Sequence, residues 1–321
     1  MKKLPLITIV GPTASGKTAL SLFLARRLGA VILSGDAYQV YRGMNIGTAK
    51  ASPEERREIP HYLIDCMNPG DIYSAGIFQE QAGRLIRSAY RKGIIPILAG
   101  GTGLYVQGLL EGYSFRPKGK GRSDYRKLYD REGSQGLARE LAEKKGVSVS
   151  DLPRDPQRMI RELELIDAGA DPDKKSKSKE RIYEGPVIGL FMGRQKLYER
   201  INLRAENMIK KGLRQEVESL LAQGVSPDAQ CMRGIGYQEM LSVIRGDIPE
   251  EEGLRLIQRN TRHFAKRQMT WFRRMPYIRW FEGKEGAETA LEESVFQYVR
   301  QELDRMAVQI KPSEKQRQEK L

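Results

Sequence analysis

One octapeptide constrains the fold of this chain more than any other feature. It lies between an apolar run, 6–10, and an amphipathic run, 19–28, and it reads Gly11-Pro12-Thr13-Ala14-Ser15-Gly16-Lys17-Thr18. A strand, a glycine-rich loop and a helix in that order are typical of a phosphate-binding loop, in which backbone N–H groups surround the anion and the lysine adds positive charge. We therefore predict that residues 11–18 bind phosphate and that the Thr18 hydroxyl is a ligand of Mg²⁺. The motif indicates a ligand group but not a reaction.

Strand patterns alternate with helical patterns through the first third of the chain. Further strands are expected at 31–33, 62–64 and 94–99, and a helix is expected at 74–92. The inner face of that helix is predicted to carry Ile77, Gln81, Leu85 and Ala89. Because crossovers of this length join parallel strands, we predict an α/β fold with a P-loop NTPase-like parallel sheet as its core and a helical insertion domain.

Changes in residue composition and in predicted secondary structure divide the chain into four predicted segments. Residues 1–114 begin the α/β core, and residues 115–185 form the helical insertion, bounded by a basic Gly/Pro-rich loop and a polar loop. Residues 186–308 complete the core, and residues 309–321 form a flexible charged tail. Within the third segment we expect helices at 195–223, 236–244 and 249–275 and a strand at 277–281.

Composition narrows the class of protein. No apolar run approaches the roughly 20 residues of a membrane span, and the first residues do not resemble a signal peptide. Two cysteines, Cys66 and Cys231, are too few for a disulfide framework or a zinc site. We therefore expect a cytoplasmic protein that does not enter a membrane.

The net charge of +14 favours a polyanionic partner over a merely basic surface. Much of this excess lies in the predicted helices after residue 190, among which 249–275 is the most informative. One face holds Leu254, Ile257, Thr261, Phe264 and Gln268, and a neighbouring basic ridge holds Arg255, Arg259, Arg262, Lys266 and Arg273. Acidic partners are missing after Glu252, so we predict that the ridge contacts a polyanion, with a solvated helix face as the alternative. Trp271 and Phe272 are predicted to be core residues, with base-stacking platforms as the alternative.

Two polar residues follow predicted strands beside the phosphate loop. Asp36 comes after the strand 31–33, and Thr102 comes after the strand 94–99. Ligands of parallel sheets bind at the carboxyl ends of the strands, so we predict that both residues belong to one site with the loop. Asp36 is the candidate general base or metal-site group, and the alternative is an aspartate that caps the next short helix or turn. No acidic residue ends the strand 94–99, which disfavours a motor-type NTPase.

Two further segments carry candidate residues. Asp155 and Pro156 are typical of a helix start, and Arg158 and Arg161 then share one face of that helix. Those arginines either bind a ligand or are solvated. The segment 233–238 places Arg and Tyr around two glycines, which alone indicates little.

Taken together, these segments resemble the tRNA dimethylallyltransferase family, of the bacterial type because the zinc-finger tail of eukaryotic members is absent. The resemblance covers nearly the whole chain. Its ordered motifs are residues 11–18, 35–50, 61–65, 100–102, 155–158, 233–238 and 261–268.

The resemblance implies transfer of a dimethylallyl group from dimethylallyl diphosphate to the exocyclic N6 amine of the adenosine 3′ of the anticodon. Asp36 would accept the amine proton, Thr102 and Lys17 would complete the catalytic group, and residues 13–18 would hold the diphosphate with Mg²⁺. The enzyme would be a monomer, and its partners would be the anticodon stem-loop of tRNA and the diphosphate donor. The implied tRNA-binding residues are Asp36, Ala37, Tyr38, Gln39, Thr102, Arg126, Gln157, Arg158, Met159, Ile160, Arg161, Arg233, Gly234, Ile235, Gly236, Tyr237 and Gln238, to which the basic ridge adds Arg262 and Lys266.

Two other functions use the same phosphate loop. A small-molecule kinase, of the nucleoside-kinase type, needs a lid rich in catalytic arginines and has no use for a basic ridge. An RNA-stimulated NTPase needs the acidic strand end that this chain lacks. We therefore favour the prenyltransferase.

Overall fold

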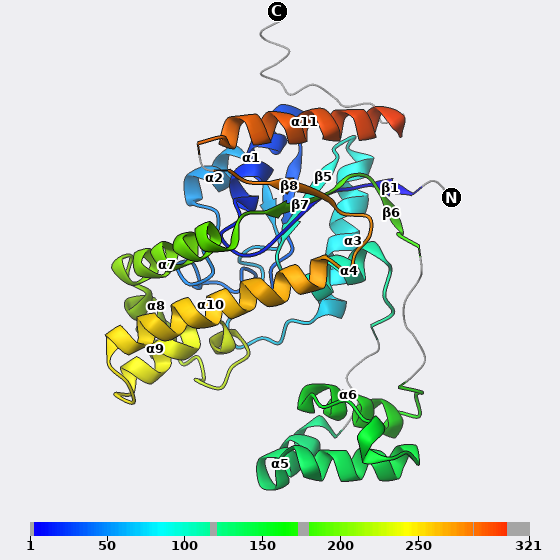
Figure 1. The fold of residues 1–321 in the computed structure, drawn as a ribbon, viewed down its shortest axis with the longest axis vertical. Helices are drawn as coiled ribbons and strands as arrows, with labels where there is room; N and C mark the ends of the chain where they lie inside the picture. Colours follow the sequence, from blue (N-terminus) through cyan, green and yellow to red (C-terminus); the bar gives the residue numbers. More distant parts are fainter. Residues whose placement is uncertain (1–2, 116–120, 173–179, 285, 307–321) are drawn as a thin grey trace, which may run out of the picture. The chain divides into compact units, whose positions relative to one another are not determined.

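The computed structural model describes residues 3–115, 121–172, 180–284 and 286–306 (Figure 1). The chain divides into two compact units, which we call the core unit (1–112 with 179–321) and the helical unit (113–178). The predicted tail, 309–321, lies outside the described residues. The predicted segment limits at 114, 185 and 308 stay predictions. In the described ranges no helix combines the length and the apolar character that crossing a membrane requires.

A six-stranded parallel sheet forms the centre of the core unit, in the order β4-β3-β5-β2-β7-β8, and a second sheet pairs β1 with β6. The predicted parallel α/β fold is therefore confirmed. The strand before the phosphate loop, β2, lies between β5 and β7. The strands are β1 (Leu4–Pro5), β2 (Ile7–Val10), β3 (Val31–Ser34), β4 (His61–Tyr62), β5 (Pro96–Gly100), β6 (Tyr183–Glu184), β7 (Val187–Phe191) and β8 (Arg279–Glu282).

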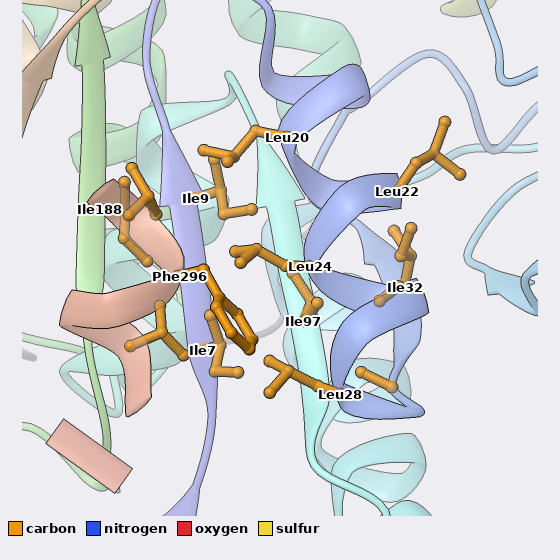
Figure 2. Close-up of a cluster of buried hydrophobic side chains, with 14 of the residues drawn as sticks. Ile7, Ile9, Leu20, Leu22, Leu24, Leu28, Ile32, Ile97, Ile188 and Phe296 are labelled. Carbon is orange, nitrogen blue, oxygen red and sulfur yellow. The ribbon is translucent and has the colours of Figure 1, made fainter. Parts of the chain in front are cut away.

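Helices α1 and α11 cover one face of this sheet. Figure 2 shows Leu20, Leu24 and Leu28 of α1 packed with Ile7 and Ile9 of β2, in a cluster that also contains Ile97 and Phe296. Burial of this cluster fixes the helix that follows the phosphate loop. The α-helices of the core unit are α1 (Lys17–Leu28), α2 (Pro53–Glu58), α3 (Ala75–Arg91), α4 (Gly103–Leu110), α7 (Arg194–Lys210), α8 (Leu213–Ala222), α9 (Tyr237–Ile244), α10 (Glu250–Phe272) and α11 (Glu288–Arg305), with a short 3-10 helix, η2 (Cys231–Arg233).

Two helix predictions need correction. The predicted helix 195–223 is two helices, because Lys211 ends α7 and Gly212 adopts a left-handed φ of 93°. The buried face of α3 is also rotated by one position from the predicted stripe, since Ile77, Gln81 and Leu85 are only half-buried. The buried residues of α3 are Ala75, Phe78, Ala82, Gly83, Ile86 and Ala89.

The helical unit has a hydrophobic core of its own. It contains α5 (Arg122–Lys145), α6 (Pro156–Asp167) and a 3-10 turn, η1 (Val149–Asp151). As predicted, the Asp155 carboxylate caps α6 and Pro156 occupies its first turn. Leu137 and Leu141 of α5 pack with Met159 and Leu163 of α6.

An ion pair holds the loop that follows β3. The Lys50 side chain is 2% exposed, and its ammonium donates to the Asp65 carboxylate at 2.5 Å and to the Tyr41 carbonyl. Hydrogen bonds from Lys50 and Arg56 hold the pKa of Asp65 below its usual value although partial burial opposes them. Ala49 and Asp65 both have left-handed backbone, with φ of 45° and 50°, so this contact also offsets local strain.

Replacing Asp65 with asparagine is therefore expected to destabilise the fold. The change leaves a nearly buried ammonium without its counter-charge, and breaking such a pair costs about 3 kcal/mol of unfolding free energy. Asparagine tolerates the left-handed backbone at this position, so the change tests the charge. The measurement is urea unfolding.

The matched control is Glu80→Gln, which breaks the exposed i,i+4 pair with Arg84 on α3. It is expected to cost less than about 0.5 kcal/mol. Equal losses for the two variants would contradict the assignment of the Lys50–Asp65 pair as a structural anchor.

Candidate active site

Two adjoining cavities open at the carboxyl ends of the central strands. The larger has a volume of about 480 Å³ and the smaller about 110 Å³. Thr13, Asp36, Gly101, Arg204 and Gln268 line both of them. Because β2, β3 and β5 all end at these cavities, the sheet brings together segments that are far apart in the sequence.

The phosphate loop forms one wall of the smaller cavity. Gly11 has a φ of 153°, and a Cβ there would lie 2.6 Å from the Leu190 carbonyl oxygen, so this position requires glycine. Gly16 leads into α1 without a side-chain cap, which leaves the first N–H groups of the helix available to an anion. Thr13, Lys17 and Thr18 line the smaller cavity. The local geometry therefore matches the predicted phosphate cradle.

Two cations face this cradle. The Lys17 ammonium donates to the Pro12 carbonyl at 2.6 Å. Burial, with a smaller effect from the nearby Arg204, lowers the pKa of Lys17 to about 7, although Asp36 opposes both effects. Burial likewise lowers the pKa of Arg204, again against the effect of Asp36. An anionic ligand between these two side chains would stabilise both positive charges.

Arg204 is a residue that the sequence analysis missed. It lies on α7, near the buried Ile201 and Ala205, and it lines both cavities. Among the described residues it has no hydrogen-bond or ion-pair partner. The available signal was an arginine on the apolar face of a helix, where a charge needs a partner.

Asp36 is held in place by the turn that follows β3. Its Oδ1 accepts the backbone N–H groups of Tyr38 at 2.8 Å and of Gln39 at 3.2 Å. Within the described part of the chain its Oδ2 has no hydrogen-bond partner. The two predicted roles are therefore compatible: one oxygen organises the turn, and the other is available to a ligand in either cavity.

Thr102 joins the ends of β3 and β5. Its hydroxyl oxygen accepts the Ala37 N–H at 3.1 Å, and its own N–H donates to the Gly35 carbonyl at 3.3 Å. Thr102 lines the larger cavity together with Asp36, so the two residues lie in one site, as predicted. The hydroxyl proton of Thr102 is not needed for the bond to Ala37, and it can be donated to a ligand.

Gln268 connects α10 to the phosphate loop. Its side-chain oxygen accepts the Thr13 N–H at 2.8 Å, and its amide nitrogen donates to the Gly101 carbonyl at 2.9 Å. Gln268 and Ile257 are buried, which agrees with the packed face predicted for α10. Phe272 is buried, but Trp271 is 37% exposed and lines the larger cavity, so its prediction as a core residue is wrong.

The cations of the basic ridge differ from one another in exposure and in interaction partners, although their spacing is regular. Arg255 pairs with Glu252, and Arg262 is half-buried, where it donates to Asn202 and lies over the Tyr198 ring. Arg259, Lys266 and Arg273 are exposed. Arg255 is exposed as well, so Arg259, Lys266 and Arg273 are the exposed ridge cations without an ion-pair partner among the described residues.

The segment 233–238 contributes a wall of the larger cavity. Arg233, Gly234, Ile235 and Tyr237 line it, together with Asp36, Ala37 and Tyr38. Gln39 lines only the smaller cavity, whereas Gly236 and Gln238 line neither.

The remaining predicted residues lie in the helical unit. Arg126 is half-buried on α5, and Gln157, Arg158 and Arg161 lie on α6. Met159 and Ile160 are each 1% exposed in the core of that unit, so their side chains are not available to an RNA surface. Those two predictions need correction, because the α6 stripe that includes them packs against α5.

Known proteins resemble this chain in sequence and in structure. Residues 39–275 match the family model described as IPP transferase. The tRNA dimethylallyltransferase of Macrococcus caseolyticus is 42% identical over 89% of this chain and 93% of its own length. That of Pelotomaculum thermopropionicum is 41% identical over 87% and 91%. The crystal structure of the tRNA isopentenylpyrophosphate transferase from Bacillus halodurans has a TM-score of 0.73 and 35% identity, and it covers 95% of this chain and 98% of its own.

These relatives share sequence with nearly the whole chain and share its fold. They are prenyltransferases that act on tRNA, which confirms the resemblance and disfavours the kinase alternative. The chain therefore belongs to the IPP transferase family of tRNA-modifying prenyltransferases.

Proposed function

We propose that this enzyme transfers a dimethylallyl group from dimethylallyl diphosphate to the exocyclic N6 amine of the adenosine 3′ of the anticodon, with release of diphosphate. The observation that carries the proposal is the pair of adjoining cavities with Asp36 in their shared wall. A phosphate cradle with Lys17 and Arg204 lines the smaller cavity, and the surface of the larger is mainly apolar, although arginines also line it. A substrate with an anionic group at one end and a prenyl group at the other fits that division.

The diphosphate is proposed to lie in the smaller cavity. Backbone N–H groups of the loop and the cations Lys17 and Arg204 would hold it. When the bond between C1 of the prenyl group and the diphosphate oxygen breaks, the electron pair stays on that oxygen. Preorganised donors that stabilise this charge lower the barrier.

The prenyl group and the adenine are proposed to share the larger cavity. Ile201, Met208, Phe264 and Trp271 supply apolar surface there. As the N6–C1 bond forms, the amine proton moves to Asp36, whose Oδ2 faces no competing donor among the described residues. The amine lone pair is delocalised into the ring, so a base within hydrogen-bond reach is needed. Thr102 is proposed to orient the amine.

tRNA prenyltransferases in general use a divalent metal cation. The described residues contain no cluster of three or more His, Cys, Asp or Glu side chains that could hold one by themselves. They do fit an ion held mainly by the diphosphate, because Mg²⁺ keeps several waters and needs few protein ligands. We propose that Thr18 supplies one ligand and that the ion adds positive charge at the leaving group.

The tRNA is proposed to bind through its anticodon stem-loop, with the target base extruded from the loop into the larger cavity. Exposed cations of α10, and Arg126, Gln157, Arg158 and Arg161 of the helical unit, would contact its backbone. We further propose that the enzyme acts on tRNA in the cytoplasm as a monomer.

A single assay tests this function. Purified protein is mixed with Mg²⁺, unmodified tRNA and dimethylallyl diphosphate labelled in the prenyl group. Label is expected to enter the tRNA, and it should be lost when guanosine replaces the target adenosine. ATP-dependent phosphorylation of a small molecule without transfer of label would overturn the proposal in favour of the kinase.

The exposed ridge carries a separate prediction. Replacing Arg259 and Lys266 together with alanine is expected to weaken tRNA binding and to reduce the slope of log K against log [salt] by about 1.5, because each lost phosphate contact removes about 0.7–0.9. Filter binding at several salt concentrations measures this slope. The control is Arg91→Ala with Lys92→Ala, two exposed cations at the end of α3. An unchanged slope for Arg259 and Lys266 would mean that the ridge faces solvent.

A further inference from the structure

We propose that Glu216 is a positioning residue for the tRNA side of the reaction, an inference that rests on the proposed function. Glu216 lies on α8 and lines neither cavity. Its carboxylate gathers hydrogen bonds from two segments that do line the larger cavity. It thereby holds them together as one wall.

The first segment is the turn at residues 45–47. Glu216 Oε2 accepts the N–H groups of Asn45 and Ile46, each at 2.8 Å, and Oε1 accepts those of Ile46 at 3.1 Å and Gly47 at 3.2 Å. Three consecutive backbone N–H groups that converge on one anion form a nest, which is a strong site for a carboxylate. The turn therefore depends on the negative charge of Glu216.

The second segment is 233–238, through Tyr237. The Tyr237 hydroxyl donates to Glu216 Oε1 at 2.5 Å. Burial, followed by the nearby Glu216 carboxylate, raises the pKa of this hydroxyl, so it remains a donor at neutral pH. The Tyr237 ring also packs so closely under Gly47 that a Cβ at position 47 would overlap it. One carboxylate and one aromatic ring thus lock the two segments.

This wall connects to the proposed base. Gly47, Thr48 and Tyr237 line the larger cavity. The Thr48 carbonyl accepts the side-chain amide of Gln39 at 3.2 Å, and the Gln39 N–H donates to Asp36 Oδ1. Hydrogen bonds therefore link Glu216 to the turn that holds Asp36, while the phosphate loop takes no part in this chain of contacts.

A neighbouring residue shows that this arrangement differs from an ordinary surface charge. Glu218, two positions along α8, is exposed and makes the usual i,i+4 ion pair with Arg214. The partners of Glu216 are instead backbone N–H groups and a hydroxyl. Glu218→Gln is therefore the matched control for Glu216→Gln.

The test measures kcat and KM for tRNA and for dimethylallyl diphosphate, together with the urea midpoint, for the full chain. Glu216→Gln is expected to raise the KM for tRNA and so to lower kcat/KM for tRNA at least tenfold, with the KM for dimethylallyl diphosphate within twofold of wild type. Glu218→Gln should leave all four kinetic values within twofold. A purely structural role would instead lower the amount of active enzyme without changing either KM.

Tyr237→Phe keeps the ring under Gly47 and removes only the hydroxyl, so it decides the matter if Glu216→Gln fails to fold. It should lower kcat/KM for tRNA severalfold, again without changing the KM for dimethylallyl diphosphate. Wild-type kcat/KM in either variant, or equal losses for both substrates, would overturn this inference alone. A wild-type protein that transfers no label to tRNA would overturn the proposed function and the inference with it.

Discussion

Replacing Asp36 with asparagine should lower kcat for prenyl transfer by about 10²–10⁴-fold, the usual contribution of a general base. Asparagine retains an oxygen that can accept the N–H groups of Tyr38 and Gln39, so the turn after β3 is expected to survive. The amine proton would then lack its acceptor. Single-turnover transfer of the labelled prenyl group to tRNA measures this loss.

Measuring the affinity for tRNA distinguishes a loss of catalysis from a loss of folded structure in this experiment. It is expected to stay within about threefold of wild type for Asp36→Asn, since contacts to the nucleic-acid backbone supply most of the affinity. The control is Asp71→Asn, because Asp71 accepts an N–H group in an exposed turn away from both cavities. Loss of tRNA binding together with activity would reassign Asp36 to a structural role.

Replacing Lys17 with methionine should lower kcat by about 10²–10³-fold, as for loss of one preorganised donor to a developing anion. Methionine keeps most of the length of the side chain and removes the charge that is proposed to face the leaving group. Inhibition by inorganic diphosphate is expected to weaken as well, while tRNA affinity is retained. Rapid-quench transfer and competition with diphosphate measure the two effects.

A second lysine controls for the loss of charge. Lys92, exposed at the end of α3, should tolerate methionine with less than a twofold change in kcat. Because Lys17 also donates to the Pro12 carbonyl, the urea midpoint of Lys17→Met shows whether the loop itself is disturbed. Full activity of this variant would exclude Lys17 from the leaving-group site.

Features that depend on a short stretch of sequence could be predicted well. The strand, loop and helix around residues 11–18 form as expected, because glycine positions and apolar runs act over a few residues. The meeting of Asp36 and Thr102 was also predictable, since parallel strands deliver their carboxyl ends to one edge. Asp155 and Pro156 begin α6 for equally local reasons.

The site features that could not be predicted from the sequence depend on contacts between distant segments. The sequence shows Arg204 on the apolar face of a helix, but its place beside the phosphate loop depends on where α7 lies in the fold. Trp271 was expected in the core because aromatic side chains usually pack there, but it lines a cavity. Met159 and Ile160 were carried over as part of a motif, although the partner of their helix face is α5. Glu216 gives no signal in the sequence, since its partners are main-chain groups of a loop about 170 positions away and the hydroxyl of Tyr237.

The bridge made by Gln268 limits how this scaffold can be redesigned. Its side chain must accept from an N–H group and donate to a carbonyl at the same time, at the reach of α10 from the phosphate loop. Glutamate offers no donor, lysine no acceptor, methionine neither at useful strength, and asparagine is one methylene short. Variants of α10 with altered RNA contacts can therefore change exposed cations such as Arg259 and Lys266 without disturbing this bridge, but position 268 must keep a side chain that both donates and accepts at that reach.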